Sequence, residues 1–535
     1  MTGWDYIVVG AGSAGCVVAS RLSENPQVRV LLLEAGASAD SFWVRTPAGM
    51  AKLFQSRRHN WGFSTEPVPA LGDRSIYWPR GKGLGGSSAI NGMVYTRGNR
   101  RDYDHWEKLG NAGWGWRDVL PYFLRSENNL RGPNAVRGVG GLMTVADPAM
   151  RLKSVDDFVE AASRAGIPRI DDLSCAGEEG VGILQATIDS GVRQSAYDAF
   201  IKPHLGRANL EVRSGVHVRR VLLSGSVATG IEVQGQEGTQ SLHAKREVIL
   251  CAGALSSPQL LMLSGIGNAP DLQKFGLPVV SHLPGVGRNL QDHCSVHVKV
   301  GAVPGSSYNR ALRGWRKYLE GARYLVTKSG YLSLPSSLAA AFVRSGDSVD
   351  YADLEISFRP MTFSFDDGGG VDVDPYEAFS ASVYRVRPAS RGELMLRSPD
   401  PLEPPAFYPN YLDATEDRVA MVAGLRKVRQ ILAQEPIASS IRSELSPGAS
   451  MTSDEQLLQF VEQHAKCAYH PAGTCKMGHD PMAVVDDQLR VHGIERLRVV
   501  DASVMPTVIS GNTNAPTIMI GEKGADLIKA QAEHP

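Results

Sequence analysis

This chain of 535 residues lacks any excess of charge of one sign. Lys and Arg together number 56, as do Asp and Glu, so the formal net charge is zero. Proteins that bind nucleic acid or anionic membranes through their overall charge are usually strongly basic. The sequence therefore predicts no nucleic-acid partner, although a neutral total does not exclude a local basic patch.

Long apolar runs and internal repeats are also missing. No stretch approaches the roughly 18 uncharged apolar residues that a membrane-spanning helix needs. The first apolar run, at residues 6–9, is too short for the core of a signal peptide. Nothing recurs with a period of 20–50 residues, which argues against a repeat architecture. With 43% hydrophobic and 21% charged residues, the composition predicts an ordinary globular protein without a transmembrane segment.

Cysteine is scarce. No two cysteines form C-x-x-C, so the sequence predicts neither a zinc site nor a redox dithiol, and no metal is expected. Scattered cysteines without a disulfide pattern are typical of reduced thiols, and we predict a cytoplasmic protein. The six cysteines lie at positions 16, 175, 251, 294, 467 and 475.

Glycine, by contrast, is present in specific places. The first 35 residues predict a strand, a glycine turn, a helix and a second strand, which is the start of a βαβ unit. Gly10, Gly12 and Gly15 form the turn, and Glu34 lies at the tip of the second strand. Such glycines let the backbone approach a pyrophosphate, and the carboxylate can accept hydrogen bonds from a ribose diol. The motif predicts a dinucleotide, FAD or NAD rather than NADP, with a turn needed only for packing as the alternative.

A second glycine-rich segment spans residues 81–91 (GKGLGGSSAIN). Gly85, Gly86 and Ser87 offer closely spaced N–H and hydroxyl donors for a phosphate or a flavin. Taken alone, the segment is equally compatible with a flexible loop. Two such cradles far apart in the sequence suit a long cofactor that is held at two points, which favours FAD over NAD.

The pattern of residue types changes between about residues 294 and 453. Aromatic residues become more frequent, and apolar runs become short and alternating, as is typical of an antiparallel sheet. The apolar runs at 246–252 and 497–500 instead predict buried parallel strands. We therefore predict an α/β domain into which a second domain is inserted. The acidic, glycine-rich segment 366–374 is predicted to be an exposed loop, with a substrate lid as the alternative.

Six segments, in unbroken order along the chain, resemble the glucose–methanol–choline (GMC) oxidoreductase family. The likeness runs from the first strand to the last helix. The segments are 81–104 (GKGLGGSSAINGMVYTRGNRRDYD), 253–267 (GALSSPQLLMLSGIG), 287–293 (GRNLQDH), 469–478 (YHPAGTCKMG), 501–506 (DASVMP) and 511–517 (GNTNAPT).

The resemblance implies a fold and an activity. The fold is an α/β FAD-binding, Rossmann-like domain plus an α+β substrate domain built on an antiparallel sheet. The activity is FAD-dependent oxidation of an alcohol, in which a hydride passes to the flavin N5 and the hydroxyl proton passes to a base. The FAD-binding domain is expected at 1–155, 190–295 and 465–535, and the substrate domain at 156–189 and 296–464.

The same resemblance assigns residues to the cofactor. The first turn and the tip of the second strand hold the ADP half, Val218 meets the adenine through its backbone, and the second cradle lines the pyrophosphate and flavin. Some relatives attach the flavin through a histidine in that cradle. Residues 89–91 contain none, so we expect non-covalent FAD. The predicted cofactor-binding residues are Gly10, Gly12, Ser13, Ala14, Gly15, Glu34, Ala35, Arg80, Gly85, Gly86, Ser87, Asn91, Gly92, Met93, Val94, Val218, Ala252, Gly253, Asp501, Ala502, Asn512 and Thr513.

Removal of the hydroxyl proton needs a base with a pKa near the working pH, and histidine is the usual choice. Among thirteen histidines, His470 stands out because it lies in a Tyr-His-Pro-Ala-Gly loop. The resemblance places it over the flavin, so we predict that it is the catalytic base. Asn514, where some relatives carry a second histidine, is predicted to steady the developing alkoxide, with a plain turn residue as the alternative. His464, six residues before His470, is predicted to have no catalytic role.

Substrate and acceptor are less well specified. The resemblance favours a primary alcohol, aliphatic or aromatic, that is oxidised to the aldehyde, with electrons passed to a quinone or a carrier protein. An oxidase that reduces O₂ to peroxide is the alternative, and a lyase with structural FAD, an electron carrier and an NAD-linked dehydrogenase are more distant ones. Choline would need an aromatic cage and usually a carboxylate, which the sequence does not locate. Monomer and homodimer are both compatible with the sequence.

One segment has a pattern of its own. Residues 312–326 (LRGWRKYLEGARYLV) predict an amphipathic helix with four basic residues. Such a helix could touch a membrane, where quinones reside. The favoured interpretation is a solvated basic face over an apolar stripe that is packed against the protein.

Overall fold

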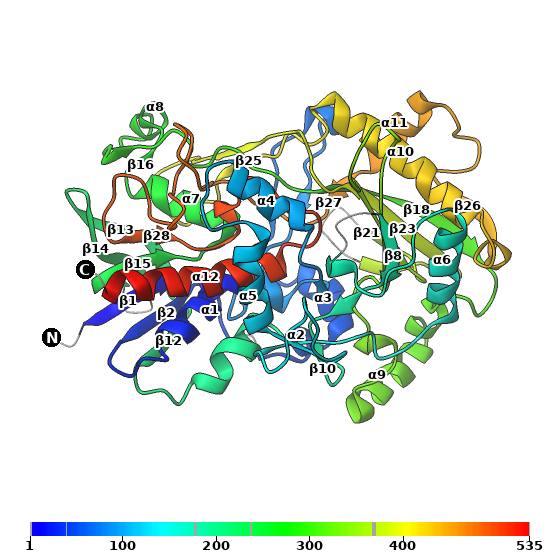
Figure 1. Ribbon diagram of the computed structural model, residues 1–535, viewed down its shortest axis with the longest axis horizontal. Helices are drawn as coiled ribbons and strands as arrows, with labels where there is room; N and C mark the ends of the chain where they lie inside the picture. Colours follow the sequence, from blue (N-terminus) through cyan, green and yellow to red (C-terminus); the bar gives the residue numbers. More distant parts are fainter. Residues whose placement is uncertain (1–2, 39, 176–178, 236–237, 366–370, 534–535) are drawn as a thin grey trace.

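The structure is a computed structural model that describes residues 3–38, 40–175, 179–235, 238–365 and 371–533. Two large sheets lie side by side along the long axis of the molecule, each with helices packed on it (Figure 1). The chain crosses from one sheet to the other several times, because both sheets are built from segments that are far apart in the sequence. The cavity described below lies where the two sheets meet.

The first sheet is parallel at its centre. β1 (Trp4–Val9) lies between β2 (Val30–Glu34) and the end of β15 (Gly238–Leu250). β12 (Leu210–Ser214) continues the sheet beyond β2, and β28 (Leu497–Val499) pairs with β15. All residues of β2 are buried, as expected of a parallel strand that is covered on both faces.

Helices and a ribbon complete the first half. α1 (Ser13–Leu22) packs on β1 and β2, and α12 (Asn514–Glu533) packs along α1, so the last helix of the chain lies beside the first. The first part of β15 forms an antiparallel ribbon with β14 (Val227–Gly235) and β13 (His217–Ser224). The parallel strands end at the glycine turn, where their carboxyl ends form the binding edge that α/β sheets use.

The second sheet is antiparallel and supports the other half of the molecule. α10 (Thr415–Leu432) and α6 (Lys153–Arg164) cover one of its faces. β27 (Lys466–Cys467) pairs with the start of the second strand of the sheet. In order across the sheet, the main strands are β26 (Ile441–Ser446), β18 (Cys294–Ala302), β23 (Ala378–Arg385), β20 (Leu354–Arg359), β19 (Ala339–Val343) and β8 (Gly180–Ile183).

Alternation along these strands separates an apolar face from a polar one. Val296, Ile356 and Val383 are fully buried, and Val383 lies directly under Gly424 of α10. Their sequence neighbours point to the opposite face, because successive side chains of a strand alternate. That opposite face carries serine, histidine, glutamate, arginine and tyrosine side chains, and it lines the cavity.

The observed architecture confirms the predicted fold class: a Rossmann-like α/β part and a part built on an antiparallel sheet. Strand membership differs slightly from the predicted domain ranges, because β18 begins at Cys294 and β27 lies at Lys466–Cys467. In the predicted loop 366–374, residues 366–370 lie outside the described residues. Val371–Val373 form β22, which pairs with β21 (Phe363–Phe365).

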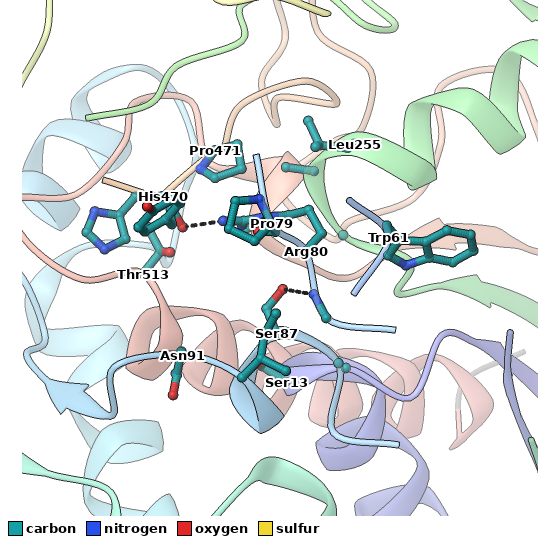
Figure 2. A pocket seen from close by; sticks show the side chains of 18 of the residues that line it. Ser13, Trp61, Pro79, Arg80, Ser87, Asn91, Leu255, His470, Pro471 and Thr513 are labelled. Carbon is teal, nitrogen blue, oxygen red and sulfur yellow. Dashed lines mark hydrogen bonds between the residues drawn. The ribbon is translucent and has the colours of Figure 1, made fainter. Parts of the chain in front are cut away.

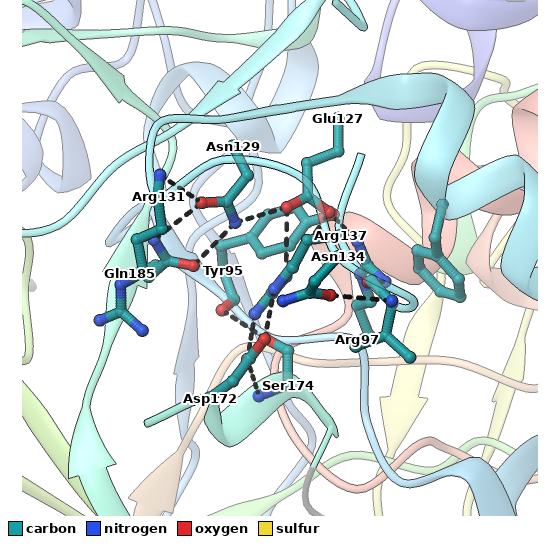
Figure 3. Close-up of polar contacts among 12 residues, drawn as sticks. Tyr95, Arg97, Glu127, Asn129, Arg131, Asn134, Arg137, Asp172, Ser174 and Gln185 are labelled. Carbon is teal, nitrogen blue, oxygen red and sulfur yellow. Dashed lines mark hydrogen bonds and ion pairs between the residues drawn. The ribbon is translucent and has the colours of Figure 1, made fainter. Parts of the chain in front are cut away.

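A buried ion network joins the two halves of the molecule (Figure 3). Arg97 and Arg137 both pair with Glu127, and Arg137 also pairs with Asp172. Glu127 is fully buried, so its charge depends on these two guanidinium groups for compensation. Asp172 follows α6 in the chain, and the network therefore ties the second half to β6 (Glu127–Asn129), which follows the α5 helix (Trp116–Ser126).

One helix stands apart from the packed body. α9 (Arg316–Thr327) projects at the edge of the second half, at the lower right of Figure 1, and Tyr324 is its one buried residue. Among the described helices, none combines the length and the apolar character needed to cross a bilayer. The apolar stripe of α9 is not packed against the protein, so the interpretation favoured from the sequence is wrong on this point.

Candidate active site

A cavity of about 600 Å³ extends from the carboxyl ends of β1 and β2 to the polar face of the second sheet. Figure 2 shows His470 and Thr513 at one end of it and Trp61 toward the other. Open α/β sheets bind ligands at this edge, and the second sheet supplies the wall that faces the reacting end.

The first glycine turn is shaped by close backbone contacts. A Cβ atom on Gly15 would collide with the carbonyl oxygen of Gly10, and a Cβ on Gly10 would lie 2.6 Å from the carbonyl oxygen of Cys251. α1 begins at Ser13, and the first N–H groups of a helix have no acceptor within the helix. These donors face the cavity with the positive end of the helix dipole, which is the environment a pyrophosphate requires.

The second glycine segment lies against the first. The N–H of Gly85 donates to the carbonyl oxygen of Ala11 over 2.8 Å, and a Cβ on Gly86 would lie 2.8 Å from Cα of Gly12. Gly86 also has φ +52°, a conformation that favours glycine. The two cradles, 70 residues apart in the chain, therefore form one continuous surface that fits an elongated dinucleotide such as FAD.

Glu34 lies at the tip of β2 and lines the cavity, but its carboxylate also organises the turn. Oε2 accepts from the N–H of Ala11 at 3.1 Å, and Oε1 accepts from the N–H groups of Gly36 and Gly83 at 2.8 and 2.9 Å. Burial raises the pKa of Glu34, and these three donors oppose that shift. Oε2, which accepts from a single N–H group, keeps a second lone pair that is available to a ribose hydroxyl.

The structure brings the predicted cofactor residues together. All of them line the cavity except Gly15 and Gly85, which lie behind its wall at the close contacts just described. Asp501 is fully enclosed and accepts from Ser257 Oγ at 2.5 Å and from the N–H of Gly253 at 2.8 Å. It therefore links the last strand to the start of α7 (Gly253–Leu263).

The loop that carries His470 is held by Asp292. Oδ1 of Asp292 accepts from the backbone N–H of His470 at 2.6 Å, and Oδ2 accepts from the Tyr411 hydroxyl and from Cys467 Sγ. Arg80 adds a hydrogen bond from Nη2 to the carbonyl oxygen of Tyr469 at 2.9 Å. The imidazole is thus fixed from the side of the second sheet and from the second glycine cradle.

A chain of hydrogen bonds determines which nitrogen of His470 carries the proton. His293 Nε2 lies 2.8 Å from the carbonyl oxygen of Val386, which can only accept, so this nitrogen is protonated. Burial lowers the pKa of His293 to about 4, so the ring is neutral and its Nδ1 is an acceptor. His470 Nδ1 lies 2.9 Å from that atom and must therefore donate. The Nε2 of His470 is therefore unprotonated and can only accept.

The amide that donates to this nitrogen belongs to Asn512. Its Nδ2 lies 3.0 Å from His470 Nε2, and Thr96 contacts both its backbone N–H and its amide oxygen. Asn514, which the sequence analysis assigns to the alkoxide, begins α12, and its amide oxygen accepts from Ser13 Oγ at 2.7 Å. Asn512 precedes the helix and faces the imidazole, whereas the amide oxygen of Asn514, which also lines the cavity, is turned toward α1; the role of Asn514 stays a prediction.

The environment keeps His470 unprotonated at neutral pH. Burial lowers its pKa well below the usual range, and the nearby His293 and Arg80 act in the same direction. An imidazole in this state can accept a proton from a bound hydroxyl. The site thus combines a dinucleotide cradle with an acceptor of protons at its reacting end.

Comparison with known proteins identifies the family. Models of the N-terminal and C-terminal parts of GMC oxidoreductases match residues 4–295 and 388–521. The chain belongs to the GMC oxidoreductase family. Human mitochondrial choline dehydrogenase is 42% identical over 537 residues, covering 99% of this chain and 90% of that protein. Oxygen-dependent choline dehydrogenase of Brucella anthropi is 40% identical over 526 residues, covering 98% and 95%.

Solved structures agree with this assignment. Pyridoxine 4-oxidase from Mesorbium loti shares 32% identity with a TM-score of 0.88, and both chains are covered fully. A formate oxidase variant from Aspergillus oryzae RIB40 shares 28% identity with a TM-score of 0.91, covering 100% of this chain and 99% of that one. The protein is therefore an FAD-dependent alcohol oxidoreductase, and FAD is its non-covalently held cofactor.

Sequence reasoning missed several residues of this GMC oxidoreductase site. His293 closes the segment 287–293, yet nothing in that segment indicated a contact with His470. His297, Glu355 and Arg359 line the cavity from the second sheet. The available signal was the alternation of polar and apolar residues in strands β18 and β20. His464, which is predicted to have no catalytic role, is exposed at the end of α11 (Asp454–His464) and lies outside the cavity lining.

Proposed function

We propose that the protein oxidises a primary alcohol to the aldehyde, with His470 as the base. The observation that carries this proposal is the unprotonated Nε2 of His470, which lines the cavity and accepts a hydrogen bond from the amide of Asn512. When bound, FAD supplies the acceptor for the hydride of the carbinol carbon. The reaction class follows from the family, and the roles of the two side chains are inferred from their contacts.

His470 and Asn512 form different hydrogen bonds with the substrate hydroxyl. A substrate hydroxyl between them donates to His470 Nε2 and accepts from Asn512 Nδ2, in place of the hydrogen bond that now joins these atoms. As the proton leaves, the amide stabilises the negative charge that develops on oxygen. His293 holds the ring through Nδ1, so the proton is accepted at a single atom. Because His470 is 8% exposed, water is largely kept from the reacting end.

Choline is a second candidate substrate, because relatives about 40% identical are named choline dehydrogenases. On the side of the second sheet, the described part of the cavity wall has one buried carboxylate, Glu355, with the ring of Tyr384 beside it. Both oxygens of Glu355 are engaged, by Ser357 Oγ at 2.8 Å and by the Tyr384 hydroxyl. Support for choline from these residues is therefore weaker than support for an alcohol in general.

For the electron acceptor, we propose a quinone in a membrane. The supporting feature is α9, on which an apolar stripe faces solvent among basic residues. Val326 is 84% and Trp315 is 67% exposed. Aromatic and apolar side chains flanked by lysine and arginine are typical of helices that lie in a membrane interface. Besides those two, Tyr318, Leu319 and Leu325 make up the stripe, and Arg313, Arg316, Lys317 and Arg323 flank it.

A cytoplasmic location that allows contact with the membrane surface agrees with the state of the cysteines. Five of them, Cys16, Cys251, Cys294, Cys467 and Cys475, are buried free thiols. Reduced cysteines are the usual state in the cytoplasm. We therefore propose that the protein works in the cytoplasm and binds the membrane from that side.

The central test is anaerobic bleaching of the 450 nm flavin absorbance by a panel of alcohols. We expect His470→Ala to bind FAD normally and to lose at least a thousandfold in the bleaching rate, because the proton then has no acceptor. His464→Ala is the matched control, since this exposed histidine lies nearby in the sequence but outside the cavity lining. Undiminished bleaching by His470→Ala would refute the assignment of the base.

The same experiment tests whether FAD takes part in the reaction and which electron acceptor is used. If no alcohol reduces the flavin while FAD stays bound, the cofactor is structural and the protein is not an alcohol oxidoreductase of this kind. If alcohols reduce it, the amount of peroxide formed per turnover in air, with and without a quinone analogue, separates an oxidase from a dehydrogenase.

A further inference from the structure

Arg359 stands at the end of β20, where the polar face of the second sheet meets the cavity. Its side chain lines the cavity and lies over the ring of Phe363, with 5.3 Å between the guanidinium carbon and the ring centroid. Glu355 and Ser357 precede it on the same face of the strand. Arg359 is therefore part of the wall that a substrate contacts, on the side opposite the cofactor cradles.

Among the described residues, no carboxylate compensates the charge of Arg359. Nη2 donates to Ser337 Oγ at 3.2 Å, and Nε is buried with no acceptor. In the described part of the chain, no carboxylate lies within ion-pair distance of it. Arg359 is half-buried, and a guanidinium whose Nε is buried without an acceptor is unfavourable when it lacks a counter-ion; the loss of solvation lowers its pKa. Such a group is retained where a ligand supplies the missing negative charge.

Other charged side chains lie near Arg359. Arg359, Lys466 and Lys299 all lie close enough to the half-buried His297 to depress its pKa, although loss of solvation is the larger cause. Lys299 has its own partner, Asp374, at 3.0 Å. The carboxylate in the same wall, Glu355, accepts from Tyr384 and Ser357 and lies four residues away, about 13 Å along the strand. Among the described residues, the charged side chains that line the cavity from the second sheet are thus Arg359, Lys466 and Glu355, two basic groups and one acidic group.

We propose that the substrate is a primary alcohol with a carboxylate at its far end, which Arg359 binds while the hydroxyl lies at His470 and Asn512. This inference rests on the proposed function and adds the substrate class. A guanidinium presents parallel N–H donors that match a carboxylate, and it repels a quaternary ammonium. The carboxylate takes no part in the reaction: the carbinol loses a hydride to the cofactor and a proton to His470, and the product is the aldehyde acid.

The test uses matched alcohols that differ in charge. One series pairs ω-hydroxy acids of three to eight carbons with 1-alkanols of equal length, a second pairs 4-(hydroxymethyl)benzoate with benzyl alcohol, and choline is the cationic member. We expect kcat/KM to favour the acid over its neutral partner at least tenfold in one or both series. Arg359→Gln should lower kcat/KM for the acid at least tenfold and leave the neutral alcohol within threefold, and Arg359→Lys should restore part of the loss.

A control and a binding measurement guard against a folding defect. Arg344→Gln changes an arginine of the same domain that pairs with Glu179 outside the cavity lining, and it should alter neither substrate. In the unaltered holoenzyme, benzoate and hexanoate should raise the melting temperature and inhibit competitively, whereas benzamide and hexanamide should not. Hexyl phosphate tests whether the anion that Arg359 binds is a phosphate and not a carboxylate. Stronger inhibition by hexyl phosphate than by hexanoate would overturn the assignment to a carboxylate.

The outcomes separate the two proposals. If choline or the neutral alcohols bleach the flavin as well as the acids, or if Arg359→Gln slows both members of a pair equally, the inference about the carboxylate fails and the proposed function stands. If no alcohol of any charge bleaches the flavin, the proposed function fails.

Discussion

At the scale of single residues, the decisive feature of the site is that a backbone carbonyl sets which nitrogen of His470, the proposed base, carries the proton. The carbonyl oxygen of Val386 requires a proton on His293 Nε2, which leaves Nδ1 of His293 as an acceptor and directs the proton of His470 to its own Nδ1. His293 is therefore a positioning residue that acts through His470. Groups in this position commonly change activity by about 10–100-fold when they are removed.

A pair of variants at position 293 tests this role. Asn carries an oxygen near the place of Nδ1 and can accept from His470, whereas Leu cannot. We expect His293→Leu to lose about 10–100-fold in kcat/KM with normal FAD content, and His293→Asn to keep most of the activity. Equal activity in both variants and the parent would contradict the assigned tautomer.

The pH profile supplies a second readout of the same pair. His470 must be unprotonated to act as a base, and its pKa is depressed. As the pH falls through 6.5, kcat/KM should therefore stay constant, and it should decrease only at a pH well below 6.5. Burial is the largest cause of that depression, and it remains in His293→Leu. The acid limb of this variant should therefore also lie below pH 6.5, whereas a defect that opened the site to water would move the limb toward pH 6.5.

At the scale of elements, function depends on two glycine segments that touch. Each segment has a recognisable pattern, but only the fold brings Gly86 against Gly12. Their contact leaves room for a dinucleotide along both cradles and allows the Gly85 N–H to bind the first turn. The same scale explains why Asn512 and Asn514 have different contacts: the start of α12 turns the second amide toward Ser13 and leaves the first beside His470.

Gly86→Ala tests the contact between the cradles. The new Cβ would lie 2.8 Å from Gly12 Cα, and alanine at positive φ adds about 1–2 kcal/mol of strain. We expect the FAD dissociation constant to rise at least tenfold, measured by titrating the apoprotein and following flavin fluorescence.

Gly72→Ala is the matched control for Gly86→Ala. Gly72 has φ +66°, and a Cβ there would meet nothing within 4 Å. It imposes a similar backbone strain without the collision, so it should lower stability without changing FAD affinity. Equal FAD affinity in both variants would show that the cradles need not touch.

At the scale of the whole molecule, the two halves share the walls of the cavity and are tied together by the ion network around Glu127. α9 lies away from the cavity and from this network. Its exposed apolar stripe has no packing role in the described structure, since Tyr324 is the one buried residue of the helix. A surface of this kind favours contact with a lipid interface. The placement would bring the substrate domain close to a membrane that contains quinone.

Trp315→Ser combined with Leu319→Ser tests this contact. We expect the parent enzyme to sediment with anionic phosphatidylglycerol vesicles and to be released by salt, because basic residues flank the stripe. The double variant should bind at least fivefold more weakly. Its turnover with a water-soluble dye should be unchanged, while turnover with quinone in vesicles should fall.

Leu130→Ser, at another exposed leucine, is the control for the vesicle experiment. It should bind vesicles as the parent does. Unchanged vesicle binding by the double variant would exclude α9 as the membrane contact and leave the electron acceptor to be sought elsewhere.

Local patterns alone were enough to specify the parts of this protein that depend on short stretches of chain. The buried strands, the turn at Gly10–Gly12, the tip carboxylate of Glu34 and the loop around His470 follow from residue spacing and backbone conformation, which act over a few positions. The resemblance of six ordered segments was enough to indicate FAD and the reaction class. These features could be predicted because each motif carries its own geometry.

Contacts between distant segments were decided by the tertiary structure. Which nitrogen of His470 is unprotonated depends on Val386, 84 residues away in the chain, and which asparagine faces it depends on how α12 docks on α1. The uncompensated charge of Arg359 and the exposure of α9 are likewise properties of packing, since a strand or helix pattern does not state what lies opposite it. Long-range packing selects one partner among many that the local sequence permits.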